Sequence, residues 1–199
     1  MTMLHADKPS LELMHPAESH SDVLLQASRR LDWRFLLPDP GLDRVAYIGP
    51  IHGTLLPTLR QFSKSDVLEA PDADDAGYDV VVLRNPSLNR LRSAVRLVRP
   101  GGCLYAEISG AGRLPGRYVT TLRRAGLTQV EMYWHWPNFE KCTRIIPLGG
   151  PTPLVYTLIK GQTGVVPQFW AILLHWLHQT GLLHLALWHF SLVAQREDA

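Results

Sequence analysis

Residues 44–53 read RVAYIGPIHG, an apolar run that enters a turn holding two glycines. A second apolar run, YDVVVL, covers residues 78–83. Residues 97–108, LVRPGGCLYAEI, pass through a Pro-Gly-Gly turn into a third apolar run. Strands this apolar leave no polar face for water, which is typical of the centre of a parallel sheet. The three runs therefore predict the middle strands of such a sheet.

Segments with helical spacing of apolar residues separate these strands. Strands alternating with helices predict an α/β fold with a doubly wound sheet. The strands are expected at residues 45–48, 66–69, 78–83, 103–108 and 128–134, and the helices at 21–31, 54–62, 88–97 and 117–125. The lead-in after the first helix is expected to pack Trp33, Phe35 and Leu36 against the core.

The composition favours one globular domain. The chain has 199 residues, of which 46% are hydrophobic and 19% charged, enough for a single core. Residues 1–20 lack a signal-peptide pattern and are expected to form a disordered tail, which leaves residues 21–199 as one domain. The net charge of +2 gives no electrostatic basis for binding nucleic acid. Two cysteines without metal-type spacing predict no metal site and fit a cytoplasmic location, with Cys103 buried in a strand.

The last quarter of the chain has a different character. Residues 161–195 contain no Asp, Glu, Lys or Arg, and they are rich in leucine, tryptophan and histidine. Gln179, Thr180 and Gly181 interrupt the apolar run that begins at Pro167, so its length suits a buried or interfacial helix better than a membrane span. Residues 164–189 are expected to cover the sheet, to contact a membrane surface peripherally, or to form a homodimer.

The glycine turn, the central strand and the Pro-Gly-Gly turn, in this order, resemble the nucleotide-binding half of class I S-adenosylmethionine (SAM) dependent methyltransferases. Residues 188–196, WHFSLVAQR, resemble the last strand of that family, which runs antiparallel beside the strand of Tyr105. The resemblance implies a Rossmann-like, mostly parallel sheet with an antiparallel last strand. It also implies that residues 136–187 are a helical insertion that caps the substrate site.

The resemblance implies SAM as cofactor. The family's loop reads acid, any, Gly, any, Gly, any, Gly, and here Gly49 and Gly53 match its outer glycines, while Tyr47 stands at the acid and Ile51 at the middle glycine. The position of Glu69 matches the acid that binds the ribose hydroxyls. Further cofactor contacts are expected from His52 in the loop and Asn85 after the central strand. Only eight residues separate Glu69 from Tyr78, so the edge helix and strand of the family are expected to be missing.

An aromatic segment, YWHWPNFE at residues 133–140, follows the expected strand at residues 128–134. His135 is the predicted acid–base residue because its ordinary pKa lies near neutrality, and Glu140 is predicted to orient it. The alternative is an aromatic cluster that only packs. The sequence thus predicts a SAM-dependent methyltransferase that acts on a small-molecule acceptor such as a sugar, lipid or secondary metabolite. The alternative function is a non-catalytic binding or assembly subunit that has lost SAM binding.

Overall fold

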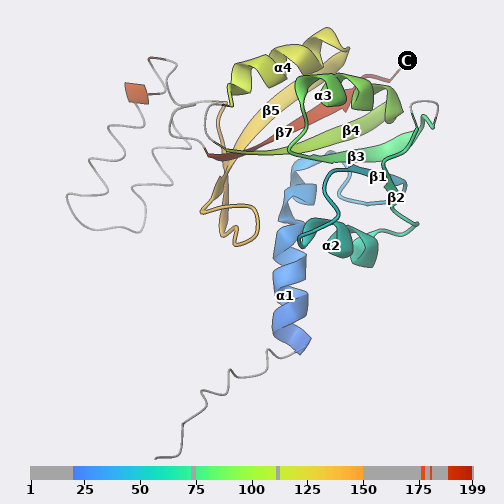
Figure 1. Cartoon of the computed structure of the whole chain (residues 1–199), viewed down its shortest axis with the longest axis vertical. Coiled ribbons are helices and arrows are strands. Elements are labelled where there is room, and N and C mark those ends of the chain that lie inside the picture. The colour runs from blue at the N-terminus through green and yellow to red at the C-terminus, as the bar shows by residue number, and fades with distance from the viewer. Residues whose placement is uncertain are drawn as a thin grey trace, which may run out of the picture.

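A computed structural model describes residues 20–72, 75–110, 113–149, 176–177, 180 and 188–198. The described residues contain a seven-stranded sheet in the order β2-β1-β3-β4-β7-β5-β6 (Figure 1). Its strands are β1 (Val45–Ile48), β2 (Leu68–Glu69), β3 (Tyr78–Arg84), β4 (Val98–Ser109), β5 (Leu127–Trp136), β6 (Arg144–Pro147) and β7 (His189–Arg196).

The first four strands pair in parallel. β7 lies between β4 and β5 and is antiparallel to both, and β6 is antiparallel to β5. Tyr105 of β4 faces Val193 of β7 in the register. The predicted doubly wound sheet with an antiparallel last strand is therefore confirmed.

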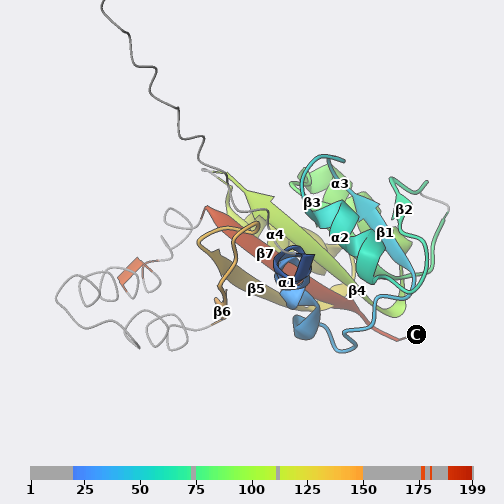
Figure 2. The same ribbon diagram turned by 90° about the horizontal axis from the view of Figure 1, so that it is seen from below.

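Helices cover both faces of the sheet (Figures 1 and 2). They are α1 (His20–Arg30), η1 (Asp32–Leu36), α2 (Leu55–Phe62), α3 (Leu88–Ala94), η2 (Val95–Leu97) and α4 (Pro115–Arg124). α3 and α4 lie on one face, whereas α1 and α2 lie on the other. Side chains of β3 alternate between the two cores: Val81 and Leu83 pack toward α3 and α4, and Val80 and Val82 toward α2. This alternation makes the strand apolar throughout and explains its strong sequence signal.

Only one of the two aromatic residues in the lead-in packs against the core. Trp33 is buried and stacks on Tyr105 with ring centroids 3.8 Å apart. The expectation for Phe35 is wrong, because 65% of its surface is exposed and it lies under the guanidinium of Arg34. A 3₁₀ turn places residues two apart on different sides, so only one of the two aromatic rings can face the sheet.

The chain after Trp136 does not enter a helical insertion directly. Residues 144–147 form β6 and extend the sheet at its edge, which corrects the start of the predicted cap. Most of the remaining insertion, together with residues 1–19 of the predicted tail, lies outside the described residues. The domain boundaries and the cap therefore stay predictions. Within the described part of the chain, no helix combines the length and hydropathy needed to span a bilayer.

The edge of the sheet is shortened as expected. Described residues between β2 and β3, at 70–72 and 75–77, form neither helix nor strand. β2 pairs with β1 over only two residues, Leu68 and Glu69. The sheet thus ends at β2 on this side.

Candidate functional site

The direction of winding changes beside β1. The chain leaves β1 for β2 on one side and then returns to β3 on the other side. Ile48 and Leu83, near the carboxyl ends of β1 and β3, are register partners. Open α/β sheets bind ligands in the crevice at such a switch point. The glycine turn at residues 49–53 and Asn85 both lie at this edge, as the sequence predicted.

The side chain of Arg84 crosses the glycine turn. Its Nη1 donates a hydrogen bond to the carbonyl oxygen of His52 over 3.0 Å. A Cβ added to Gly53, which has a φ of +105°, would collide with that same nitrogen. A Cβ on Gly49 would lie 2.8 Å from both the Cβ of Arg84 and the hydroxyl of Tyr47. The two glycines therefore make room for side chains of this protein.

Tyr47 holds the turn from inside. Its ring is buried, and its hydroxyl donates to the carbonyl oxygen of Pro50 over 2.8 Å. Burial raises the pKa of this phenol, so it stays neutral and keeps its proton for that bond. Ile51 is 70% exposed and does not fill the space above the turn.

The other predicted cofactor residues have partners of their own. Asn85 has a φ of +50°, and its Oδ1 accepts a hydrogen bond from the amide of Ser109 over 2.7 Å. Its own amide donates to the carbonyl oxygen of Glu107 over 2.7 Å, so Asn85 ties the ends of β3 and β4 together. Glu69 forms an ion pair with Arg60 of α2. The exposed His52 contributes its carbonyl to Arg84.

These contacts decide how SAM fits the edge. In the described conformation the guanidinium of Arg84 lies where a ligand would approach Gly53. That group is the far end of a flexible side chain and can rotate away. At Gly49 the obstruction includes the Cβ of Arg84, which cannot move without the backbone. In this conformation neither glycine has room for a group as large as a methyl, and the space over Gly53 can open if the Arg84 side chain rotates.

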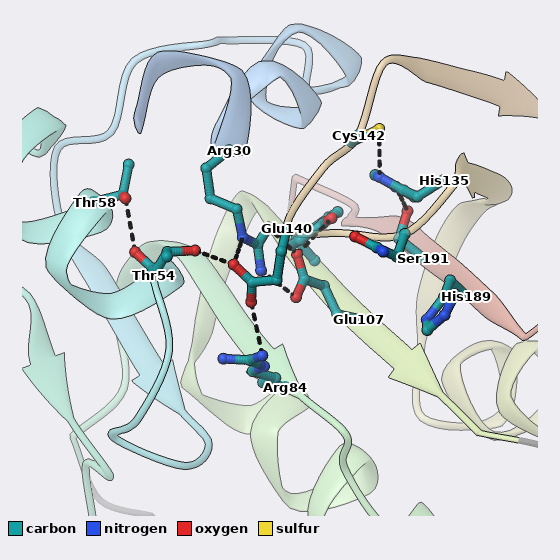
Figure 3. Close-up of polar contacts among 12 residues, drawn as sticks. Arg30, Thr54, Thr58, Arg84, Glu107, His135, Glu140, Cys142, His189 and Ser191 are labelled. Atoms are coloured by element: carbon teal, nitrogen blue, oxygen red, sulfur yellow. Dashed lines mark hydrogen bonds and ion pairs between the residues drawn. The ribbon is translucent and has the colours of Figure 1, made fainter. Parts of the chain in front are cut away.

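Two acidic residues meet two arginines beside the turn (Figure 3). Arg30 of α1 binds Glu107 of β4 through two nitrogens at 2.5 and 2.6 Å, with both side chains almost fully buried. Burial alone would lower the pKa of Arg30, but the carboxylate of Glu107 raises it above its usual value. Glu140 contacts Arg84 Nη2 at 2.8 Å, the hydroxyl of Thr54, and Arg30 Nε at 3.6 Å. The four charges are thus paired within the protein.

His135 lies in the core, away from Glu140. Its Nε2 hydrogen-bonds the hydroxyl of Ser191 at 2.8 Å, and its Nδ1 lies 3.5 Å from the sulfur of Cys142 (Figure 3). Burial and the positive charge of Arg30 lower its pKa to about 3, so the ring is neutral. The predicted pairing of Glu140 with His135 is wrong, because Glu140 reaches across to Arg84 instead. Near His135, Phe139 packs its ring at 4.6 Å, as the aromatic-cluster alternative expected.

The sequence missed Arg30, Arg84 and Glu107. A signal existed for Glu107, which interrupts the apolar run at residues 103–108. A carboxylate in a buried strand must be paired, since burying an unpaired charge is very costly. The arginines carried no comparable signal.

No family model matches the chain, and no curated protein matches it. Solved structures do. A SAM-dependent methyltransferase from Archaeoglobus fulgidus is 13% identical, with 87% of this chain and 94% of that chain covered and a TM-score of 0.44. A SAM-dependent methyltransferase from Thermotoga maritima is 10% identical, with 87% and 92% covered and a TM-score of 0.43. Phosphoethanolamine N-methyltransferase 2 of Haemonchus contortus, in complex with SAM, is 10% identical, with 86% and 53% covered and a TM-score of 0.48.

The strand order and the antiparallel β7 are the decisive observations about the fold. Together they make the sheet arrangement that the resemblance to class I methyltransferases implies. Its edge beyond β2 is shortened, and β6 is added at the other edge. A shared fold does not establish a shared activity, so the function depends on what the edge at β1 and β3 can bind.

Proposed function

We propose that this chain is a methyltransferase-like protein that binds SAM at the carboxyl ends of β1 and β3 and acts on a small-molecule acceptor. One observation carries the proposal: the glycine turn after β1 lies at the switch point of the sheet. Backbone at such a turn can approach a nucleotide closely because glycine has no Cβ.

Arg84 is the group that has to move. Its guanidinium contacts the carbonyl of His52 and the carboxylate of Glu140, and it is partly exposed. Rotation of this side chain uncovers Gly53 without a change of backbone. The proposed cofactor contacts are then Gly53, the backbone of His52, and Glu69 at the end of β2.

The acceptor would enter beside the aromatic segment at residues 133–140. Trp136 is an exposed aromatic residue at the end of β5 and offers an apolar surface. An acceptor such as a sugar, lipid or secondary metabolite suits it better than a polyanion. Glu140 is the accessible titratable residue of the segment, whereas His135 is a neutral, buried group that could act on an acceptor only if the core opened.

Calorimetric titration of the protein with SAM tests the proposal. We expect saturable binding and a rise in the unfolding midpoint, since a ligand at 100 times its dissociation constant stabilises a protein by ~2.7 kcal/mol. Gly53→Val should abolish binding, because it adds a branched side chain at a positive φ. Gly116→Ala is the control, because a Cβ at Gly116 meets open space. Absence of heat and of any shift at millimolar SAM would overturn the proposal.

A second candidate is a non-catalytic binding or assembly subunit. Two observations favour it. The space beside Gly49 is filled by Arg84 and Tyr47, and the charges at the edge are paired within the chain. The same titration separates the two candidates. For either one, we also propose a cytoplasmic location, peripheral membrane contact and a homodimer through residues 164–189. Flotation with liposomes tests the membrane contact, light scattering tests the homodimer, and fractionation of cells tests the location.

A further inference from the structure

The carboxylate of Glu140 lies among donors that come from three other elements (Figure 3). Arg84 at the end of β3 donates from Nη2 over 2.8 Å. Thr54, which precedes α2, donates its hydroxyl. Arg30 of α1 places its Nε 3.6 Å away. Glu140 belongs to the loop between β5 and β6, whereas the three donors belong to other elements. We call these three donors, Arg30, Thr54 and Arg84, the frame.

The frame is built for an anion. Arg30 has a side chain only 3% exposed, yet its Nε has no hydrogen-bond partner among the described residues. Its other two nitrogens are fixed on Glu107. Thr54 occupies the N-cap position of α2, but its hydroxyl makes no capping bond to that helix. The N-terminal end of α2, the Nε of Arg30 and the guanidinium of Arg84 all favour negative charge at this point.

Glu140 is bound more weakly than the groups around it. Its side chain is 37% exposed, whereas Glu107 is 1% exposed in its pair with Arg30. An exposed ion pair contributes little to stability, and breaking a buried one is costly. Glu140 can therefore leave the frame while Arg30 and Glu107 remain in place.

We propose that this frame is a binding site for the carboxylate of a ligand, and that Glu140 occupies it when no ligand is bound. A ligand carboxylate that displaces Glu140 takes over its contact with Arg84. The carboxylate can come from the aminoacyl part of SAM, a source that rests on the proposed function, or from a small carboxylic acid that acts as acceptor. The site makes the same contacts with either source.

The test compares wild type with Glu140→Gln, which removes the charge and keeps the shape. The probes are SAM, 5′-methylthioadenosine, which lacks the aminoacyl part, and succinate. If SAM is the source, Glu140→Gln tightens SAM binding at least tenfold and changes methylthioadenosine binding less than twofold. If an acceptor is the source, the variant gains succinate binding at least tenfold and SAM is unchanged. Equal binding of all probes by both proteins would overturn the inference.

Two further variants test whether a gain in binding depends on Arg84 and on the position of the removed charge. Adding Arg84→Met to Glu140→Gln should remove the gain, because Arg84 would receive the ligand carboxylate. Glu197→Gln changes an exposed carboxylate beyond β7 and should bind like wild type. If no variant binds SAM or methylthioadenosine, the proposed function fails, and the succinate titration still decides the carboxylate site. A gain that survives in the double variant would count against the site.

Discussion

His135 is a buried histidine that stays neutral, and this has a consequence for stability. Its pKa is about 3 in the folded chain, against an ordinary value near 6.5. As pH falls below 6.5 the unfolded chain takes up a proton that the folded chain does not, so the free energy of unfolding drops by ~1.4 kcal/mol per pH unit. Between pH 7 and 5, wild type should lose roughly 2 kcal/mol more than His135→Gln in urea denaturation.

His52 supplies the matched control, since it is exposed. His52→Gln should keep the pH dependence of wild type. Because the carboxylates are common to all three proteins, their titration cancels in the comparison. Parallel curves for wild type and His135→Gln would show that the ring takes up a proton without unfolding.

At the residue scale, the sequence predicted the glycine turn at residues 49–53 but not the side chains that fill it. Gly49, Gly53 and Asn85 were located by their place after apolar strands, and the structure puts them at one edge. Arg30 and Glu107 lie 77 positions apart, and their pairing depends on where α1 crosses the sheet. No local pattern carries such a contact. For the same reason the sequence put Glu140 beside its neighbour His135 instead of beside Arg84.

At the scale of elements, the lead-in depends on one ring. Trp33 stacks on Tyr105 with an interplanar angle of 5°, so it joins η1 to the centre of the sheet. Trp33→Ala should lower the free energy of unfolding by about 3–5 kcal/mol, as expected for a large buried aromatic residue. Chemical denaturation measures this loss. α1 should also lose protection from hydrogen exchange, because η1 connects it to the core.

Phe35→Ala is the comparison within the same element. Phe35 is exposed, so its removal should change stability by no more than about 0.5 kcal/mol. A similar loss for both variants would mean that the two rings contribute equally and that the stack is not what holds the lead-in.

The elements themselves were predictable where they are apolar on both faces. β1 and β3 were found close to their bounds because neither face meets water. The strand predicted at residues 66–69 covers only Leu68 and Glu69 in the structure, and β6 was not predicted at all. Both lie at an edge of the sheet, where a strand is brief and partly polar. The sequence predicts that the Pro-Gly-Gly turn ends before the strand begins, whereas β4 already pairs with β3 at Val98. A register shift between Tyr78 and Val80 absorbs the extra residues.

At the scale of the whole molecule, β7 joins two parts of the sheet. Among the described strands, β5 and β6 connect to β4 only through β7. Phe190 of β7 is fully buried and meets the ring of Tyr118 of α4 edge-on at 6.1 Å. The last strand in the chain is therefore at the centre of the fold, a long-range pairing that the sheet needs before its second half can form.

Deletion of residues 189–199 should abolish cooperative unfolding. Without β7, the strands β4 and β5 each lose a full set of antiparallel hydrogen bonds, and their apolar residues lose the cover of Phe190 and Leu192. Circular dichroism during heating should show a gradual loss of signal. Deletion of residues 197–199 alone removes the exposed Glu197 and Asp198, which follow the strand, and should leave the midpoint near that of wild type. A sharp transition at an unchanged temperature in the longer deletion would mean that β4 and β5 can pair directly, and the sheet would then not depend on its last strand.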